Sequence, residues 1–197
     1  MSITIVPVTE DFVAEIGDVD LANLSAGQMD EIKEAFWQYG VLVFPDQKLS
    51  QEEHVAFAKN FGPMDVSVLK KAVADQKLRI RDDIADVSNL GSDNQIMAES
   101  NRLRRMQLGN RLWHTDSSFK YVPALASLLY AREIPPVGGQ TAFADLRAAY
   151  DALDDEKKEQ LDGLVAEHSL VYSRERMGYN DWEEGERQAV SAVPQTM

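Results

Sequence analysis

His114 and Asp116 are the residues of this chain whose types and spacing are best suited to chemistry. They stand in the run LWHTDSSF at 112–119. Side chains alternate faces along an extended segment, so residues two apart project to the same side. An imidazole and a carboxylate placed in this way supply two ligands of the 2-His-1-carboxylate arrangement that binds non-haem Fe(II). The sequence therefore predicts a metal site at His114 and Asp116 that needs a second histidine.

The short pattern His-x-Asp is weak on its own, because such matches arise by chance. Its neighbours strengthen it: Trp113 and Phe119 offer bulk for a dry pocket, and the serines at 117 and 118 offer hydrogen bonds to the ligands. The chain has no cysteine, so thiolate ligands are excluded and any metal is bound by His, Asp or Glu.

The other two histidines are His54 and His168. His54 lies in a helical pattern and is interpreted as a surface or packing residue. His168 alone follows the pair, so counting would nominate it as the third ligand.

Length and composition favour one globular domain over residues 1–197. The chain is 44% hydrophobic and 27% charged, and it carries a net charge of −13. Such a charge argues against general nucleic-acid binding. No apolar run approaches the about 18 residues of a membrane span, and the first residues do not resemble a signal peptide. We therefore expect a cytoplasmic protein that binds neither nucleic acid nor membrane.

Four arginines just before the pair could provide positive potential for an anionic substrate. A solvated surface is the favoured interpretation. They are Arg102, Arg104, Arg105 and Arg111.

Capping patterns predict most of the helices. Ser25 with Gln28, and Ser50 with Glu53, form capping boxes, while Gly40 ends the first of these two helices. Asp145 and Asp154 begin two more helices. Strands are expected at 3–8, 41–44 (buried), 84–88, 126–131 and 141–144, and 193–197 looks like the start of another. Short strands with interspersed helices predict an antiparallel sandwich or barrel with helices outside. The stretch from about 70 to 111 is expected to be an irregular functional loop or a disordered segment.

Several motifs together resemble the taurine dioxygenase/TfdA family of Fe(II)- and 2-oxoglutarate-dependent dioxygenases, and within it the 2,4-dichlorophenoxyacetate branch. The most specific are WHTDSSF at 113–119, GGQTAFAD at 138–145 and RAAY at 147–150. Further matches are VLVF at 41–44, FGP at 61–63, DVSN at 86–89, Glu167-His168 and Ser173-Arg174.

The resemblance implies a mainly β fold with flanking helices, a double-stranded β-helix or jelly roll that is incomplete at the C-terminus. It implies that His114 and Asp116 bind Fe(II) and that Thr141 hydrogen-bonds a carboxylate of 2-oxoglutarate. Oxygen is the other co-substrate. A lysine after the FGP element is an expected partner for an anionic substrate, here Lys70 or Lys71, with Asn89 as a further pocket residue. A solvated role for these residues is the alternative.

The family pattern also implies that the second iron histidine follows a Trp-Asp-Asn-Arg element, with a 2-oxoglutarate-binding arginine beyond it. Neither element occurs in this chain, so the resemblance argues against His168 and leads us to expect that the family's C-terminal part is missing. A chain truncated in this way would have exposed strand edges.

The resulting hypothesis is a dioxygenase that cleaves the ether of a phenoxyalkanoate, such as 2,4-dichlorophenoxyacetate, to a phenol and glyoxylate. The protein is expected to form a homo-oligomer. One alternative is a taurine, alkylsulfonate or sulfate-ester dioxygenase of the same family. An alternative of another class is an inactive fragment or binding module.

Overall fold

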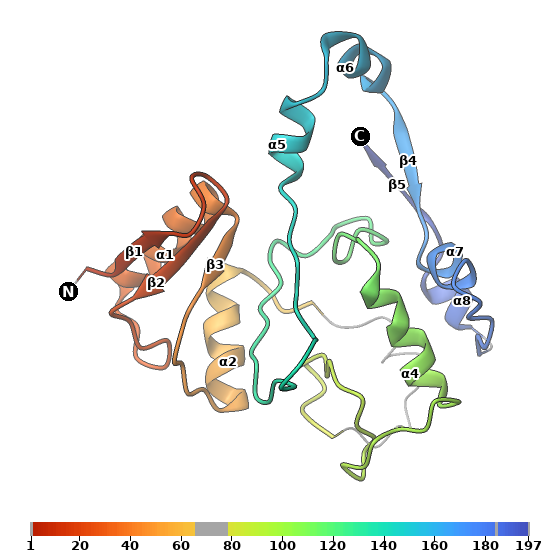
Figure 1. The fold of residues 1–197 in the computed structure, drawn as a ribbon, viewed down its shortest axis with the longest axis horizontal. Helices are drawn as coiled ribbons and strands as arrows, with labels where there is room; N and C mark the ends of the chain where they lie inside the picture. The colour runs from red at the N-terminus through yellow and green to blue at the C-terminus, as the bar shows by residue number, and fades with distance from the viewer. Residues whose placement is uncertain (1, 66–78, 184, 197) are drawn as a thin grey trace. The chain divides into compact units, whose positions relative to one another are not determined.

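The computed structural model describes residues 2–65, 79–183 and 185–196 (Figure 1). The chain divides into two compact units. The first contains Met1–Met64 and Leu128–Leu153, and the second contains Asp65–Ser127 and Asp154–Met197.

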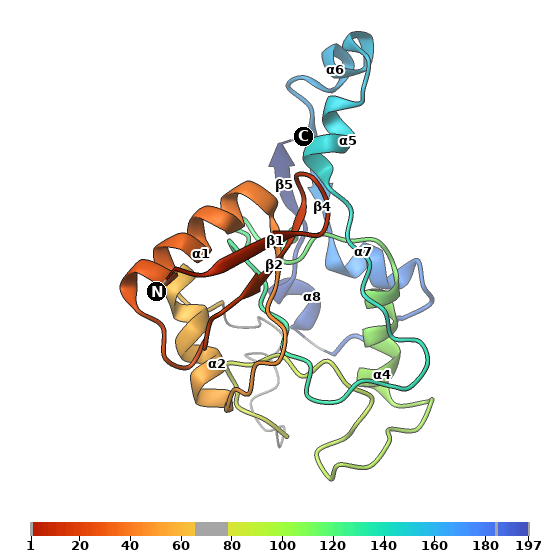
Figure 2. The same cartoon turned by 60° about the vertical axis from the view of Figure 1, so that its left-hand side comes forward.

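The first unit is built on a three-stranded sheet with the order β1-β2-β3, covered by helix α1 (Figures 1 and 2). β1 (Thr4–Pro7) runs antiparallel to β2 (Val13–Gly17), and β2 runs parallel to β3 (Val41–Val43). The strand predicted at 41–44 forms over Val41–Val43, but it is the edge strand of this sheet and Val43 is 45% exposed, so the expectation that the strand is buried is wrong. An edge strand has one side without a neighbour, which leaves its residues more accessible.

Helix α1 (Ala26–Tyr39) begins and ends where its sequence predicts. The Ser25 side chain accepts from the backbone of Gln28, and the Gln28 side chain accepts from the backbone of Ser25. Gly40 ends the helix with φ at 77°, a conformation that glycine adopts without a steric penalty. α2 (Gln51–Ala58) begins with the same kind of box at Ser50 and Glu53 and continues into the 3-10 turn η1 (Lys59–Phe61).

The core of the first unit lies between α1 and the sheet. Ile16 of β2 and Ile32 of α1 are both 0% exposed. Full burial of one such side chain stabilises a fold by about 1.5–3 kcal/mol. The remaining buried members are Ile3, Ala14, Leu21, Met29, Ala35, Tyr39, Leu49 and Phe57.

Arg147, in the short helix α5 (Leu146–Asp151), joins distant parts of the first unit. Its Nη1 donates to the Gln38 carbonyl at 3.1 Å, and its Nη2 donates to the carbonyls of Asp11 at 3.1 Å and Tyr39 at 3.4 Å. Asp145, the N-cap residue of α5, also accepts from the same guanidinium. The hydrogen bonds from Arg147 hold the pKa of the Asp145 carboxyl below its usual value. Arg147 therefore holds the start of α5 against the end of α1.

In its described residues, the second unit contains short helices and the antiparallel strands β4 and β5, with Val165 opposite Thr196. Asn101 caps α4, and its side chain accepts from two backbone N–H groups. The elements are α4 (Arg102–Gln107), the 3-10 turn η2 (Leu108–Arg111), α6 (Asp155–Leu161), β4 (Val165–His168), α7 (Leu170–Glu175), α8 (Glu186–Ala189) and β5 (Val193–Thr196).

An ion pair between Arg102 and a buried carboxylate fixes α4 in the second unit. Arg102 bonds the carboxylate of Glu186, which is 2% exposed and also accepts from the backbone of Glu183 at 2.7 Å. Burying a charge is unfavourable unless it is paired and hydrogen-bonded, and both conditions are met for Glu186.

Three predicted strands, at 84–88, 126–131 and 141–144, are not formed. A strand needs a ladder of hydrogen bonds to a neighbouring backbone, and no such ladder is formed by these segments in the described part of the chain. Their apolar residues stay accessible, as with Leu129 and Phe143, which are 68% and 58% exposed. Sheets and helices are both present, whereas the mainly β arrangement and the jelly roll stay predictions. None of the helices in the described ranges is long and apolar enough to cross a membrane.

Candidate metal centre

The side chains of His114 and Asp116 meet, as the sequence predicts. His114 Nε2 lies 3.2 Å from Asp116 Oδ1. The segment is not a strand, however, because a turn begins at Asp116. Both residues are exposed. His114 and Asp116 therefore project to the same side, as in an extended strand, although this segment is not part of a sheet.

Two hydrogen bonds orient this pair. His114 Nδ1 lies 2.6 Å from the carbonyl oxygen of Leu112, and the Ser127 hydroxyl donates to Asp116 Oδ2 at 2.7 Å. A carbonyl oxygen only accepts, so Nδ1 carries the proton and Nε2 keeps its lone pair in the neutral ring. The second carboxylate oxygen is engaged by Ser127, which leaves Oδ1 facing the imidazole.

This geometry fits a metal ion. A lone pair on Nε2 and a carboxylate oxygen at 3.2 Å repel each other unless a proton or cation lies beside both. Nitrogen and oxygen ligands that each lie about 2.1 Å from a metal in adjacent positions are about 3 Å apart. The hydrogen bond from Nδ1 to a carbonyl is also the usual support of a metal-binding histidine.

A tight turn follows the pair and is supported from two directions. Ser117 has φ at 58°, which is uncommon for a residue other than glycine. Its hydroxyl donates to Asp65 Oδ2 at 3.2 Å, and Lys120 Nζ reaches the same carboxylate at 2.5 Å. Gln195 of β5 donates to the carbonyls of Ser118 and Lys120, at 3.0 and 2.7 Å. The conformation that turns the chain after Asp116 is therefore supported by its neighbours.

The side chains expected to enclose a dry pocket do not do so. Trp113 is 73% exposed, and Phe119 is half-buried. Thr141 belongs to the first unit, where it is exposed and lies outside any strand. Asn89 is exposed next to the isolated bridge between Leu90 and Ile96, and its backbone carbonyl accepts from Met97. Lys70 and Lys71 lie outside the described residues.

A third ligand is not found among residues 2–65, 79–183 and 185–196, where His, Cys, Asp and Glu form no group of three suited to a metal. His168 lies in β4 opposite Val193. His54 packs against Tyr130, with ring centroids 5.7 Å apart, and burial followed by the charge of Arg132 lowers the pKa of its imidazole. The packing role expected for His54 agrees with this contact.

Three of the four arginines before the pair make ion pairs within the second unit. Arg102 bonds Glu186, Arg104 lies 3.6 Å from Glu99, and Arg105 lies 2.5 Å from Asp181. These contacts stabilise α4 and leave little reason to assign the cluster to an anionic substrate. The fourth, Arg111, is exposed.

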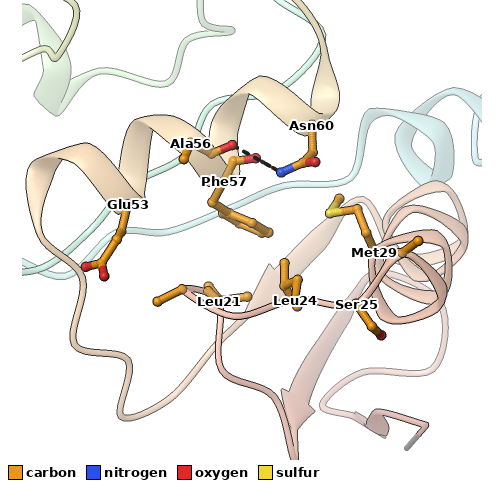
Figure 3. Close-up of a pocket in the computed structure, with 10 residues that line it drawn as sticks. Leu21, Leu24, Ser25, Met29, Glu53, Ala56, Phe57 and Asn60 are labelled. Carbon is orange, nitrogen blue, oxygen red and sulfur yellow. Dashed lines mark hydrogen bonds between the residues drawn. The ribbon is translucent and has the colours of Figure 1, made fainter.

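A hollow of about 240 Å³ lies in the first unit, where the start of α1 faces α2 (Figure 3). Its polar side chains serve the helix ends: Ser25 and Glu53 belong to capping boxes, and Asn60 donates to the carbonyls of Ala56 and Phe57. None of the predicted site residues lines it. The hollow is therefore a feature of helix packing.

Comparison with known proteins identifies the family. The chain matches the family described as "Taurine catabolism dioxygenase TauD, TfdA family" over residues 4–196. This chain belongs to the TauD/TfdA family. It is 38% identical over 194 residues to an alpha-ketoglutarate-dependent 2,4-dichlorophenoxyacetate dioxygenase of Cupriavidus pinatubonensis, covering 98% of this chain and 67% of that protein.

Two further relatives agree. A (S)-phenoxypropionate/alpha-ketoglutarate-dioxygenase of Sphingobium herbicidovorans is 37% identical over 177 residues, covering 89% of this chain and 56% of that protein. The crystal structure of AAD-2 in complex with Mn(II) and N-oxalylglycine superimposes with a TM-score of 0.93 at 43% identity, covering all of this chain and 68% of that one. The chain thus spans between about half and two thirds of the length of these relatives. The predicted family and the predicted class, a metal- and 2-oxoglutarate-dependent dioxygenase, are confirmed.

Sequence reasoning did not find the residues that support the pair. Ser127, Asp65 and the Leu112 carbonyl stand in irregular segments, where no periodic pattern marks a contact. The serines at 117 and 118 were expected to hydrogen-bond the ligands, but the hydroxyl that does so belongs to Ser127.

Proposed function

We propose that the domain to which this chain belongs hydroxylates a phenoxyalkanoate at the carbon beside its ether oxygen. With a phenoxyacetate, the hemiacetal product collapses to a phenol and glyoxylate. The observation that carries the proposal is the pair His114 Nε2 and Asp116 Oδ1, 3.2 Å apart, in a chain whose relatives are named for phenoxyacetate and phenoxypropionate.

Each residue of the site would have a separate role. His114 and Asp116 would hold Fe(II), with Leu112 and Ser127 fixing their orientation. Bound iron with 2-oxoglutarate and oxygen supplies the oxidant and releases succinate and carbon dioxide. The Thr141 hydroxyl would donate to a carboxylate of 2-oxoglutarate. N-oxalylglycine, the ligand in the AAD-2 structure, is an analogue of that co-substrate.

The finer structural expectations belong to the same proposal. Residues 1–197 would form part of one dioxygenase domain with the double-stranded β-helix fold. Lys70, Lys71 and Asn89 would contact the substrate. The cytoplasmic location, the homo-oligomeric state and the independence from nucleic acid and membranes stay predictions.

The test is product formation by the purified domain to which residues 1–197 belong, with the 197-residue chain alone as a second sample. Each sample is loaded with Fe(II) and 2-oxoglutarate without oxygen, where a weak visible charge-transfer band reports chelation. Oxygen is then admitted with phenoxyacetate or with taurine, and succinate and phenol are measured. From the domain we expect the band, and succinate and phenol with phenoxyacetate only.

Three outcomes would contradict the proposal. Succinate release with taurine only would favour the sulfonate alternative. A band without succinate from either substrate would favour an inactive binding module, and no band from the domain would show that it does not bind the iron and co-substrate together. A band from the domain but not from the 197-residue chain would show that this chain alone lacks part of the site. The variant Asp116→Ala is the control for metal-dependent turnover and should form no phenol.

A further inference from the structure

Arg174 of α7 is a half-buried cation whose polar contacts are all neutral. Its Nη1 donates to the Ser173 hydroxyl at 3.2 Å and its Nη2 to Asn110 Oδ1 at 3.3 Å. Its Nε is buried and has no acceptor among the residues that the structure describes. A guanidinium has five N–H donors, which is more than these contacts use, so some of its N–H groups have no acceptor among the described residues.

Other arginines of the second unit form ion pairs with carboxylates. Arg79 pairs with Asp86, Arg102 with Glu186 and Arg105 with Asp181. The chain has 33 acidic and 20 basic residues, so carboxylates are plentiful. Yet within the described ranges no carboxylate lies within ion-pair distance of Arg174, and burial lowers the pKa of its guanidinium. A partly desolvated charge without a counter-charge is unfavourable, and a bound anion would relieve it.

The glycine beneath Arg174 makes room for this arrangement. A Cβ at Gly109 would lie 2.2 Å from Arg174 Cζ, far inside contact distance. Gly109 and Asn110 belong to the turn η2, which leads directly to Leu112, whose carbonyl oxygen bonds His114 Nδ1. The unpaired guanidinium is therefore attached to the turn that precedes the metal-binding pair.

We propose that Arg174 binds the carboxylate of the organic substrate. Guanidinium and carboxylate groups pair through two parallel hydrogen bonds, which fix orientation as well as charge. The inference rests on the proposed function for the identity of the anion. Arg174 would then be a residue that recognises the substrate, and it is not one of the four arginines that precede the metal motif.

The test is an NMR titration of the ¹⁵N-labelled 197-residue chain. The arginine Nε–Hε signal that is lost in Arg174→Lys identifies Arg174, and phenoxyacetate and 2-oxoglutarate are added in separate titrations. We expect a saturable shift of this signal with phenoxyacetate. In Arg174→Gln, followed through backbone amide signals, phenoxyacetate should bind about tenfold more weakly, the value of a charge-assisted hydrogen bond.

Two further variants sharpen the test. Arg176→Gln, at the exposed end of the same helix, removes an equal charge and should change phenoxyacetate binding less than about twofold. Gly109→Ala keeps the charge but displaces the guanidinium, and should weaken binding as Arg174→Gln does. Circular dichroism checks that each variant is folded.

The inference is overturned by unchanged binding in Arg174→Gln, by equal weakening in Arg176→Gln, or by a response to 2-oxoglutarate in place of phenoxyacetate. The proposed function fails separately. If phenoxyacetate binds through Arg174 but gives no phenol, only the reaction is wrong; if phenol forms and Arg174→Gln keeps the wild-type KM, only the role of Arg174 is wrong.

Discussion

The layer formed by α1 and β2 and the segment that carries His114 and Asp116 are held in different ways. In the layer, side chains such as Ile16 and Ile32 are removed from water completely. In the segment, Trp113 and both predicted ligands are exposed, and orientation comes from hydrogen bonds to Leu112 and Ser127. The layer should therefore determine stability, whereas the segment should determine metal binding with little effect on stability.

The largest expected effect is in the layer. Ile32→Ala removes a fully buried side chain and should lower the free energy of unfolding by about 2–5 kcal/mol. Urea denaturation measures it. A loss below about 1 kcal/mol would show that the layer is packed more loosely than its burial indicates.

Asp116→Ala should strongly weaken metal binding and leave the stability of the metal-free chain almost unchanged. Metal binding, followed by Mn(II) titration, should weaken by about 100-fold or more, because one of two anchoring ligands is lost. The free energy of unfolding without metal should change by less than about 0.5 kcal/mol, since Asp116 is exposed. If metal-free Asp116→Ala were strongly destabilised, the separation between layer and segment would be wrong.

A smaller effect is expected at the start of α1. Ser25→Ala removes the side-chain acceptor for the Gln28 backbone and should lower the free energy of unfolding by about 1 kcal/mol. Ser25→Asp, which can still accept that hydrogen bond, is the matched control. Equal losses in both variants would exclude capping as the cause.

The smallest expected effect is a pH dependence at His54. Burial lowers the pKa of His54 in the folded chain below 6.5, so the unfolded chain binds more protons in this range. Its stabilising contribution is present above about pH 6.5 and is lost as the pH falls below that value toward the folded pKa. His54→Gln should make the unfolding free energy less steep between pH 7.5 and 5.5. An unchanged slope would mean that other groups cause the pH dependence.

Local capping chemistry made the helices α1 and α2 predictable. Ser25 with Gln28 and Ser50 with Glu53 specify helix starts through contacts three residues apart, and both boxes form as predicted. The strand β2 was not predicted, although Ala14 and Ile16 alternate with Val13 and Glu15. This strand is short, and its alternation is visible only when alanine is counted as a core residue.

Strands were less predictable because pairing is not local. The segment at 126–131 has strong strand propensity, yet propensity does not provide a neighbouring backbone. The same reasoning applies to the site. His114 and Asp116 could be paired from their spacing, whereas Ser127 reaches Asp116 across 11 residues of irregular chain.

The contacts of Arg147 link the local opening of α1 to the release of α5. The last turn of α1 contains no basic residue to offset the negative end of the helix dipole. Arg147 supplies that charge from a position 109 residues beyond Gln38. Opening of the last turn of α1 and release of α5 are therefore thermodynamically coupled, and hydrogen exchange at Gly40 should respond to changes in the segment that begins at Thr141.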